Sequence, residues 1–474
     1  MAMPVSICPG KEAPMKLFSV LTLLLAALLT AAGCASFQLE AGFKTPAELT
    51  ATAEAQVAGR NPKPQLGRLA FVRGGDIWVQ DLPDGKAVRL TQDGRNDTPL
   101  WSPSGEWLAF RKGVTTAGLY QLWIARATGT DARSIDIVRS GMGRQIDWSP
   151  VEDRIAYISR NGLYVVDVDG GTPRELVAPS PRLGAGVESL AWSPDGQWVA
   201  MEKRDLEGSS KPEQGQTPPR PTAQGLWRAK ADGSAIESVY LNPDPVQTQS
   251  YLAGWSPDGQ FLLFWQGQQM SGSFLADGAP LMRVPITGGI PVQLTKMLAR
   301  LDFLTWAPDG QKLALVDGTY RSTWHRKTIA VATLFGGLEG ISGADRTDIF
   351  PTWSPDGRSI AYTSAPAVAT DGGNDAKQAG GQRRIWVMAP DGSGKHQLTD
   401  DARFQDERPR WSADGDHLLF ARLEGEQAQL WLMRADGSDL KQVVDELTPS
   451  PGWFGYYGYI EWGQLYDWWT GMPL

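Results

Sequence analysis

Four acidic side chains occupy one position of a repeated pattern, four residues before a tryptophan. They are Asp97, Glu188, Asp302 and Glu407. If the repeats form a ring, these carboxylates surround its opening and attract a cation or a basic partner segment. The alternative is that the strands carrying them begin in water, where acidic residues are common. We predict no cofactor and no metal site, and the alternative is a channel-bound cation such as calcium.

The sequence gives little support for catalysis. It holds three histidines, His325, His396 and His417, and it contains no G-x-S-x-G, H-E-x-x-H, Walker A or C-x-x-C motif. Trp324 and His325 lie side by side in a predicted loop, so we add them to the four acids as candidate binding residues. We predict no catalytic residue and a protein that is not an enzyme. The alternative is an enzyme acting on glycans or peptides through paired channel carboxylates.

Tandem repeats must position these residues. The pentapeptide Trp-Ser-Pro-Asp-Gly is intact at 192–196, 255–259 and 353–357, and near-copies begin at Trp101, Trp148, Trp306 and Trp411, 44 to 63 residues apart. This period is typical of propeller blades. Within each repeat, short runs of β-branched and aromatic residues between Gly, Pro and Asp predict four antiparallel strands. We expect the tryptophans to pack between blades and the motif aspartates to cap turns.

The repeats predict one all-β propeller with eight four-stranded blades. Seven repeats start with a tryptophan, and residues 66–92 form an eighth that lacks its first strand. We expect residues 458–462 to supply that strand and close the ring, which leaves no free sheet edge. The propeller then spans 66–463, and seven blades is the alternative. Residues 464–474 form an aromatic tail, whose Trp468 and Trp469 either pack, cap the channel, stack on a sugar or touch a membrane interface.

Residues 353–399 show the repeat best, as WSPDGRSIAYTS followed by RRIWVMAPDGSGKHQLT. This pattern resembles the TolB-type, WD40-like propeller repeat. It is also similar to the repeats of the eight-bladed propellers in the prolyl oligopeptidase and dipeptidyl peptidase IV families. The resemblance implies a fold and no particular activity. The chain has more repeats than the six blades of TolB, and only 11 residues follow Gly463, so we expect no hydrolase domain.

The N-terminus has the pattern of a bacterial lipoprotein. Residues 1–33 fit a signal peptide, with Lys16 before the apolar run 17–32, and Met15 is an alternative start. The sequence Ala31-Ala-Gly-Cys34 resembles a lipobox, which implies that Cys34 is lipidated. The alternative is an ordinary signal peptide with an incidental cysteine. Residues 34–65 would be a tether with a short helix over 46–58.

These observations predict a lipid-anchored protein of the bacterial cell envelope, outside the cytoplasm. The net charge of −8 argues against a nucleic-acid partner. The long insertions all fall between the second and third strands of a repeat, which places them on one face. We expect this face to bind a protein, peptide or envelope ligand. A scaffold within a larger envelope complex is the further alternative.

Overall fold

The computed structural model describes residues 65–114, 118–139, 144–182, 184–207, 220–268, 277–368, 380–448 and 458–471. The chain divides into two units, Met1–Pro62 and Lys63–Leu474, and every described residue belongs to the second. The predicted signal peptide, Cys34 and the helix expected over 46–58 lie outside the described residues. Within these ranges, no helix is both long enough and apolar enough to cross a membrane.

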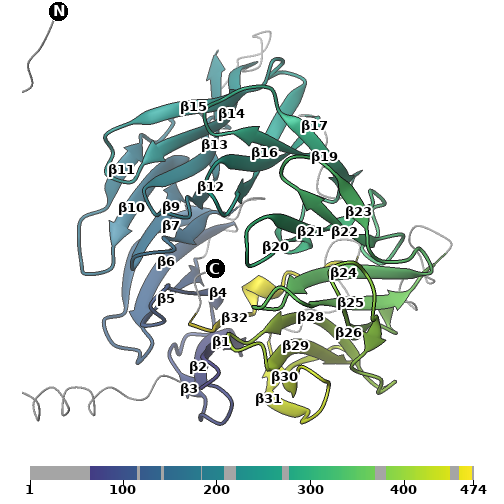
Figure 1. The fold of residues 1–474 in the computed structure, drawn as a ribbon. Helices are drawn as coiled ribbons and strands as arrows, with labels where there is room; N and C mark the ends of the chain where they lie inside the picture. Colours follow the sequence, from purple (N-terminus) through teal and green to yellow (C-terminus); the bar gives the residue numbers. More distant parts are fainter. Residues whose placement is uncertain are drawn as a thin grey trace, which may run out of the picture. The chain divides into compact units, whose positions relative to one another are not determined.

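The second unit consists of eight four-stranded antiparallel sheets arranged in a ring, which confirms the predicted eight-bladed propeller (Figure 1). We number the blades along the chain and call the strand nearest the centre of the ring the inner strand. The first four blades contain these strands: β32 (Tyr466–Trp469), β1 (Arg68–Arg73), β2 (Asp76–Asp81) and β3 (Val88–Arg89) in blade 1; β4 (Asn96–Trp101), β5 (Trp107–Gly113), β6 (Leu119–Arg126) and β7 (Arg133–Arg139) in blade 2; β8 (Ile146–Trp148), β9 (Arg154–Ser159), β10 (Gly162–Asp167) and β11 (Arg174–Val177) in blade 3; β12 (Gly186–Trp192), β13 (Trp198–Glu207), β14 (Arg220–Lys230) and β15 (Ile236–Leu241) in blade 4.

The other four blades have the same order from the inner to the outer strand. Their strands are β16 (Thr248–Trp255), β17 (Phe261–Gln268), β18 (Ala279–Pro285) and β19 (Val292–Met297) in blade 5; β20 (Leu304–Trp306), β21 (Lys312–Asp317), β22 (Thr328–Thr333) and β23 (Leu338–Gly340) in blade 6; β24 (Arg346–Trp353), β25 (Ile360–Pro366), β26 (Arg384–Met388) and β27 (His396–Gln397) in blade 7; β28 (Gln405–Trp411), β29 (His417–Glu424), β30 (Gln427–Arg434) and β31 (Lys441–Leu447) in blade 8.

The motif tryptophans tie neighbouring blades together. Each lies at the end of an inner strand, and most are buried. In five blades the indole N–H donates to the backbone carbonyl of the residue just before the tryptophan of the preceding blade. These bonds, 3.0–3.2 Å long, run from Trp148 to Leu100, Trp192 to Asp147, Trp255 to Ala191, Trp353 to Thr305 and Trp411 to Thr352. The predicted packing role of the tryptophans is therefore confirmed.

The motif aspartates cap their own turns, as predicted. The carboxylate of Asp195 accepts hydrogen bonds from the Ser193 hydroxyl at 2.6 Å and from the Gln197 backbone N–H at 3.0 Å. The same pair of bonds recurs at Asp258, Asp356 and Asp414. In each of these turns the carboxylate, the serine hydroxyl and one backbone N–H are hydrogen-bonded to one another. The aspartate therefore stabilises the turn.

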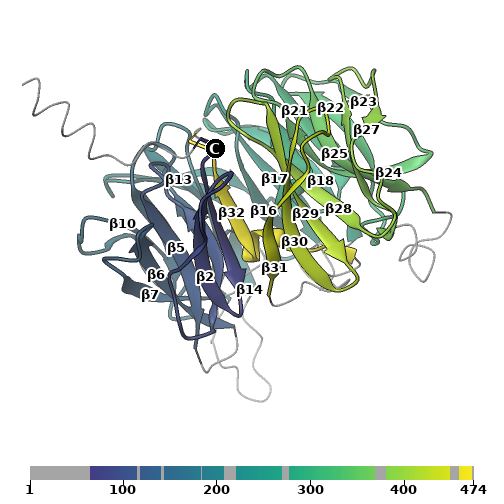
Figure 2. The ribbon, with the colours of Figure 1, turned by 90° about the horizontal axis from the view of Figure 1, so that it is seen from below.

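The strand that closes the ring is β32, and the expectation of residues 458–462 is wrong. β32 pairs antiparallel with β1, from Arg68 opposite Trp469 to Phe71 opposite Tyr466 (Figure 2). Residues 462–464 instead form the 3-10 turn η3 (Trp462–Gln464), which redirects the chain into β32. The propeller therefore extends to Trp469 and includes part of the expected tail.

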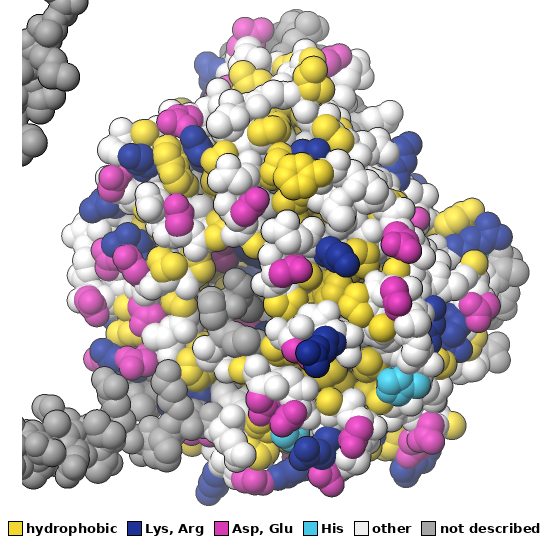
Figure 3. Space-filling view, in the orientation of Figure 1, with side chains coloured by type: hydrophobic (Ala, Val, Ile, Leu, Met, Phe, Trp, Pro, Cys, Tyr) yellow, Lys and Arg dark blue, Asp and Glu magenta, His cyan; other side chains and the backbone are white. Residues whose placement is uncertain are grey.

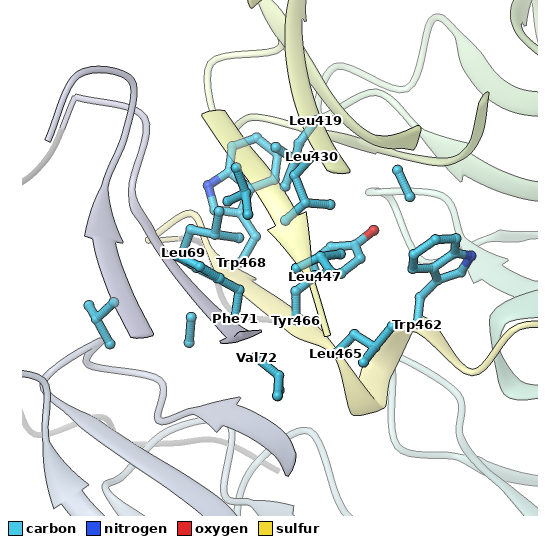
Figure 4. Packing of buried hydrophobic residues seen from close by; sticks show 14 of the residues in the cluster. Leu69, Phe71, Val72, Leu419, Leu430, Leu447, Trp462, Leu465, Tyr466 and Trp468 are labelled. Carbon is cyan, nitrogen blue, oxygen red and sulfur yellow. The ribbon is translucent and has the colours of Figure 1, made fainter. Parts of the chain in front are cut away.

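Trp468 takes the place of an eighth motif tryptophan, six residues after Trp462, which ends the segment that was expected to close the ring. It pairs with Leu69, it is buried, and its indole N–H donates to the Leu66 carbonyl at 2.8 Å (Figure 4). The preceding residue, Asp467, accepts the backbone N–H of Trp101 at 3.0 Å. For Trp468, packing is thus the correct alternative among those left open by the sequence.

The strand order gives the propeller two unlike faces. We call the side with the Trp-Ser-Pro-Asp-Gly turns and the Asp-Gly turns the turn face, and the opposite side the loop face. The long insertions join second to third strands, as predicted: β13 ends at Glu207 and β14 begins at Arg220, and β25 ends at Pro366 and β26 begins at Arg384. They therefore belong to the loop face.

Candidate binding site at the start of the inner strands

The four predicted acids lie near the start of inner strands, but each is engaged by a partner within the chain. Asp97 accepts from Arg111 at 2.7 Å, and Glu188 accepts from Arg204 at 3.5 Å. Asp302 lies on the 3-10 turn η1 (Leu301–Phe303), just before β20. Figure 3 shows acidic and basic side chains interspersed over one face of the molecule.

Asp302 and Glu407 come close together through the segment that leads into β32. The Tyr459 hydroxyl donates to Asp302, and the Trp462 indole donates to Glu407 at 2.8 Å. Glu407 also forms an ion pair with Arg383, whose Nε lies 3.3 Å from the carboxylate. The yellow segment at the centre of Figure 1 is this part of the chain.

The expectation that these strands begin in water is wrong for Glu407. Its side chain is 1% exposed. Burial raises the pKa of the Glu407 carboxyl, although the Arg383 charge and the Trp462 hydrogen bond oppose the rise. Glu407 and Asp302 thus hold the C-terminal segment in the ring.

Trp324 and His325 are also buried, in the connection between β21 and β22. The Trp324 indole donates to the Gly458 carbonyl at 3.0 Å, and the Arg383 guanidinium lies 5.2 Å from its ring. The His325 ring stands edge-on to Tyr320 at 4.6 Å. The structure thereby brings Trp324 to the same central segment as Asp302 and Glu407. Asp97 and Glu188 instead pair with arginines of their own blades, blade 2 and blade 4.

A second feature of the inner strands is a bulge shortly before the tryptophan. The pairing with the second strand shifts between Asp97 and Leu100, between Ile349 and Thr352 and between Glu407 and Arg410. The residue three before the tryptophan then adopts a positive φ, at Thr98, Phe350 and Arg408. Bulges of this kind re-aim side chains and recur beside functional sites.

The most unusual group beside the inner strands is Glu202, which the sequence did not indicate. Glu202 lies on β13, where its side chain is 2% exposed. At the same register, five other blades carry an apolar residue, such as Ile158, Trp265 and Val316, and the remaining two carry Arg111 and Thr363. A buried carboxyl at a position that suits an apolar side chain costs stability unless it is hydrogen-bonded.

Glu202 and Glu188 share one polar cluster. The Ser189 hydroxyl donates to Glu202 at 3.2 Å, and the Gln224 amide donates to it at 3.3 Å. The Glu188 carboxyl lies close enough to Glu202 to raise the pKa of the Glu202 carboxyl. Arg204 completes the cluster through its bond to Glu188.

The electrostatics of this pair favour one proton between two carboxyls. Burial, followed by the adjacent Glu188 carboxylate, raises the pKa of Glu202 well above its usual value. Two carboxyls in contact cannot both ionise without strong repulsion. A cationic ligand group placed beside the pair would remove that repulsion and displace the proton. Glycosidase carboxyls are farther apart, by roughly 5–10 Å.

Only a comparison between repeats would have found Glu202. It lies 14 residues from Glu188 in the sequence, and a single glutamate inside a strand carries no motif. Aligning the second strands of the repeats on their tryptophan partners would have shown an acid where most other blades carry apolar residues. In the part of the chain that the structure describes, no group of three or more His, Cys, Asp or Glu side chains has the geometry of a metal site.

Comparison with known proteins supports the fold. The family model of the dipeptidyl peptidase IV N-terminal region matches residues 32–114. An uncharacterised protein of Agrobacterium fabrum, Atu1656, is 31% identical over 142 residues, which is 26% of this chain and 46% of that protein's length. The curated relative is thus matched over less than half of its length.

Solved propellers are similar at low identity. Dipeptidyl peptidase 4 of Porphyromonas gingivalis is 13% identical with a TM-score of 0.57, over 82% of this chain and 60% of that one. The putative TolB of Agrobacterium tumefaciens is 21% identical over 58% of this chain and 84% of that one, but its TM-score of 0.33 adds nothing on the fold. This chain is a β-propeller whose repeat is related to that of the dipeptidyl peptidase IV propeller. These likenesses assign it no activity.

Proposed function

We propose that this chain is a non-enzymatic, lipid-anchored binding protein of the bacterial cell envelope, positioned outside the cytoplasm. Its ligand is a protein or peptide that meets the loop face and brings a cationic group to Glu188 and Glu202. The signal-peptide pattern and Cys34 support the anchoring. The net charge of −8 suits a basic partner segment.

One observation carries the proposal, namely the carboxyl pair formed by Glu202, which is buried, and Glu188, which is partly exposed. The motif aspartates cap turns, and Asp302 and Glu407 hold the C-terminal segment. No other blade carries an acid at the register of Glu202, since five blades have an apolar residue there and the other two have Arg111 and Thr363. Strongly shifted carboxyls that structure alone does not require are candidates for function. A lysine, arginine or terminal amine is the chemistry that this pair recognises.

The test is photo-crosslinking in the native envelope from the two ends of one strand. Leu241 and Ile236 lie at opposite ends of β15, and their exposed fractions are similar, 47% and 51%. A photoreactive residue at 241 samples the loop face, and one at 236 samples the turn face. We expect position 241 to capture a defined partner and position 236 to capture none.

Variants then connect the capture to the carboxyl pair. The double variant Glu188→Gln, Glu202→Gln should lower capture from position 241 at least tenfold, because it cannot offer a negative charge. The control Glu106→Gln changes an exposed acid beside a turn-face turn and should leave capture unchanged. Equal capture from both ends of β15, or full capture by the double variant, would refute the proposal. Cys34→Ser should release the protein from the membrane fraction, and its retention there would refute lipid anchoring alone.

A further inference from the structure

The centre of the ring contains buried hydrogen-bond donors that lack acceptors. Among the described residues, no acceptor reaches the Nε of Arg300, the Nη1 of Arg408 or the hydroxyl of Tyr466. Arg300 is 8% exposed and Tyr466 is 1% exposed. Buried donors are nearly always paired in folded proteins, and an unpaired one is costly. Three in one cluster therefore require an explanation.

The three groups surround the same pair of residues, Tyr459 and Asp302. The Arg300 guanidinium lies 4.0 Å from the Tyr459 ring centroid, and the Tyr459 hydroxyl is committed to Asp302. Arg408 Nη2 lies 3.7 Å from the Asp302 carboxylate. The Arg408 guanidinium also lies 5.6 Å from the Tyr466 ring.

The charges of this cluster do not balance by themselves. Arg408 pairs with Asp302, and Glu407 pairs with Arg383 and Trp462, whereas no carboxylate of the described residues forms an ion pair with Arg300. The cluster thus has an excess of one positive charge and three unused donors. A ligand that satisfies it must accept several hydrogen bonds and carry a negative charge.

The backbone conformation at Arg408 fixes the position of its side chain. Its φ is +55°, in the left-handed region that arginine rarely adopts. The bulge in β28 imposes this conformation, and the Thr363 hydroxyl accepts the Arg408 backbone N–H at 3.0 Å. Thr98 and Phe350 have a positive φ at the same bulge in blades 2 and 7, so this conformation is a recurring feature of the blade. At Arg408 it holds the guanidinium between Asp302 and Tyr466.

We propose that Arg300, Arg408 and Tyr466 form a site for an oxyanion, either a carboxylate or a phosphate group. The planar guanidinium group of arginine can donate two parallel hydrogen bonds to either a carboxylate or a phosphate. The tyrosine hydroxyl adds a third donor group. This site is independent of the carboxyl pair at Glu188 and Glu202, because it takes a ligand of opposite charge and shares no residue with it. The test of the oxyanion site can therefore give a negative result while the proposal for Glu188 and Glu202 stands, and the reverse also holds.

The test is isothermal titration calorimetry of the full chain with formate and with inorganic phosphate, at constant ionic strength. We expect saturable binding of at least one of them, and their relative affinity identifies the oxyanion. Arg408→Gly should weaken that affinity at least tenfold while folding is kept, because glycine accepts the positive φ. Arg300→Met should weaken it to a similar extent, and Tyr466→Phe should weaken it several-fold. Arg358→Met, at an exposed turn-face residue, is the control and should change nothing.

Two results would overturn the proposal. The first is no saturable binding of either anion, which would mean that water alone satisfies the donors. The second is binding that Arg408→Gly and Arg300→Met leave unchanged while both variants remain folded by circular dichroism. Thermal stability gives a second readout, since a bound anion raises the melting temperature of the native chain and should not raise that of Arg408→Gly.

Discussion

Replacing Trp468 by alanine tests the closure of the ring. Trp468 is buried, and its indole N–H donates to the Leu66 carbonyl at 2.8 Å. Truncating a buried tryptophan costs about 3–5 kcal/mol through lost burial and the cavity that remains. The lost hydrogen bond adds roughly 1 kcal/mol. We therefore expect Trp468→Ala to lower the free energy of unfolding by about 4–6 kcal/mol, which is a large part of the stability of an ordinary domain.

The assay is equilibrium unfolding in urea, followed by tryptophan fluorescence, because the chain keeps 19 of its 20 tryptophans. The control is Trp78→Ala in β2 of the same blade. Trp78 is only half-buried, so its truncation should cost less than half as much. A cost within about 1 kcal/mol of zero for Trp468→Ala would refute the assignment of β32 as the closing strand.

Two further changes probe local chemistry. Burial raises the pKa of Asp348 from 3.8 to about 6, so the folded chain holds this proton more tightly than the unfolded chain. The free energy of unfolding should then fall by up to roughly 3 kcal/mol as the pH rises from about 4 to about 6. Asp348→Asn should remove this dependence in urea unfolding at several pH values, and an unchanged pH profile would contradict it. Gly105→Ala should cost more than Gly259→Ala in the same assay: both glycines have φ +68°, but only at Gly105 would a Cβ lie 2.4 Å from the ring of Trp469. Equal costs would show that Trp469 does not pack there.

The repeat made the propeller predictable, and the end of the chain did not follow from it. Seven tryptophans followed by turn residues gave the blades and their number. Trp468 has no Ser-Pro-Asp-Gly after it, whereas Trp462 is followed by glycine, so the motif favoured the wrong residue. The better signal was the aspartate before it, because Asp467 and Asp147 both accept a backbone N–H from the first strand of another blade.

The candidate site was less predictable for a physical reason. The spacing of acids before the tryptophans correctly placed Asp97, Glu188 and Glu407 on inner strands. Spacing does not show which acid receives a partner from a distant part of the chain, as Glu407 does from Trp462. It also does not reveal Glu202, whose importance comes from burial against Glu188.

The central claim is that a cationic group of the ligand displaces the proton held between Glu188 and Glu202. The most direct measurement is calorimetry of binding between the full chain and its captured partner at pH 7, in two buffers with different ionisation enthalpies. The difference gives the number of protons released on binding. We expect binding to the wild-type chain to release protons and binding to Glu202→Gln to release none. The same proton count in the wild type and in Glu202→Gln would contradict it.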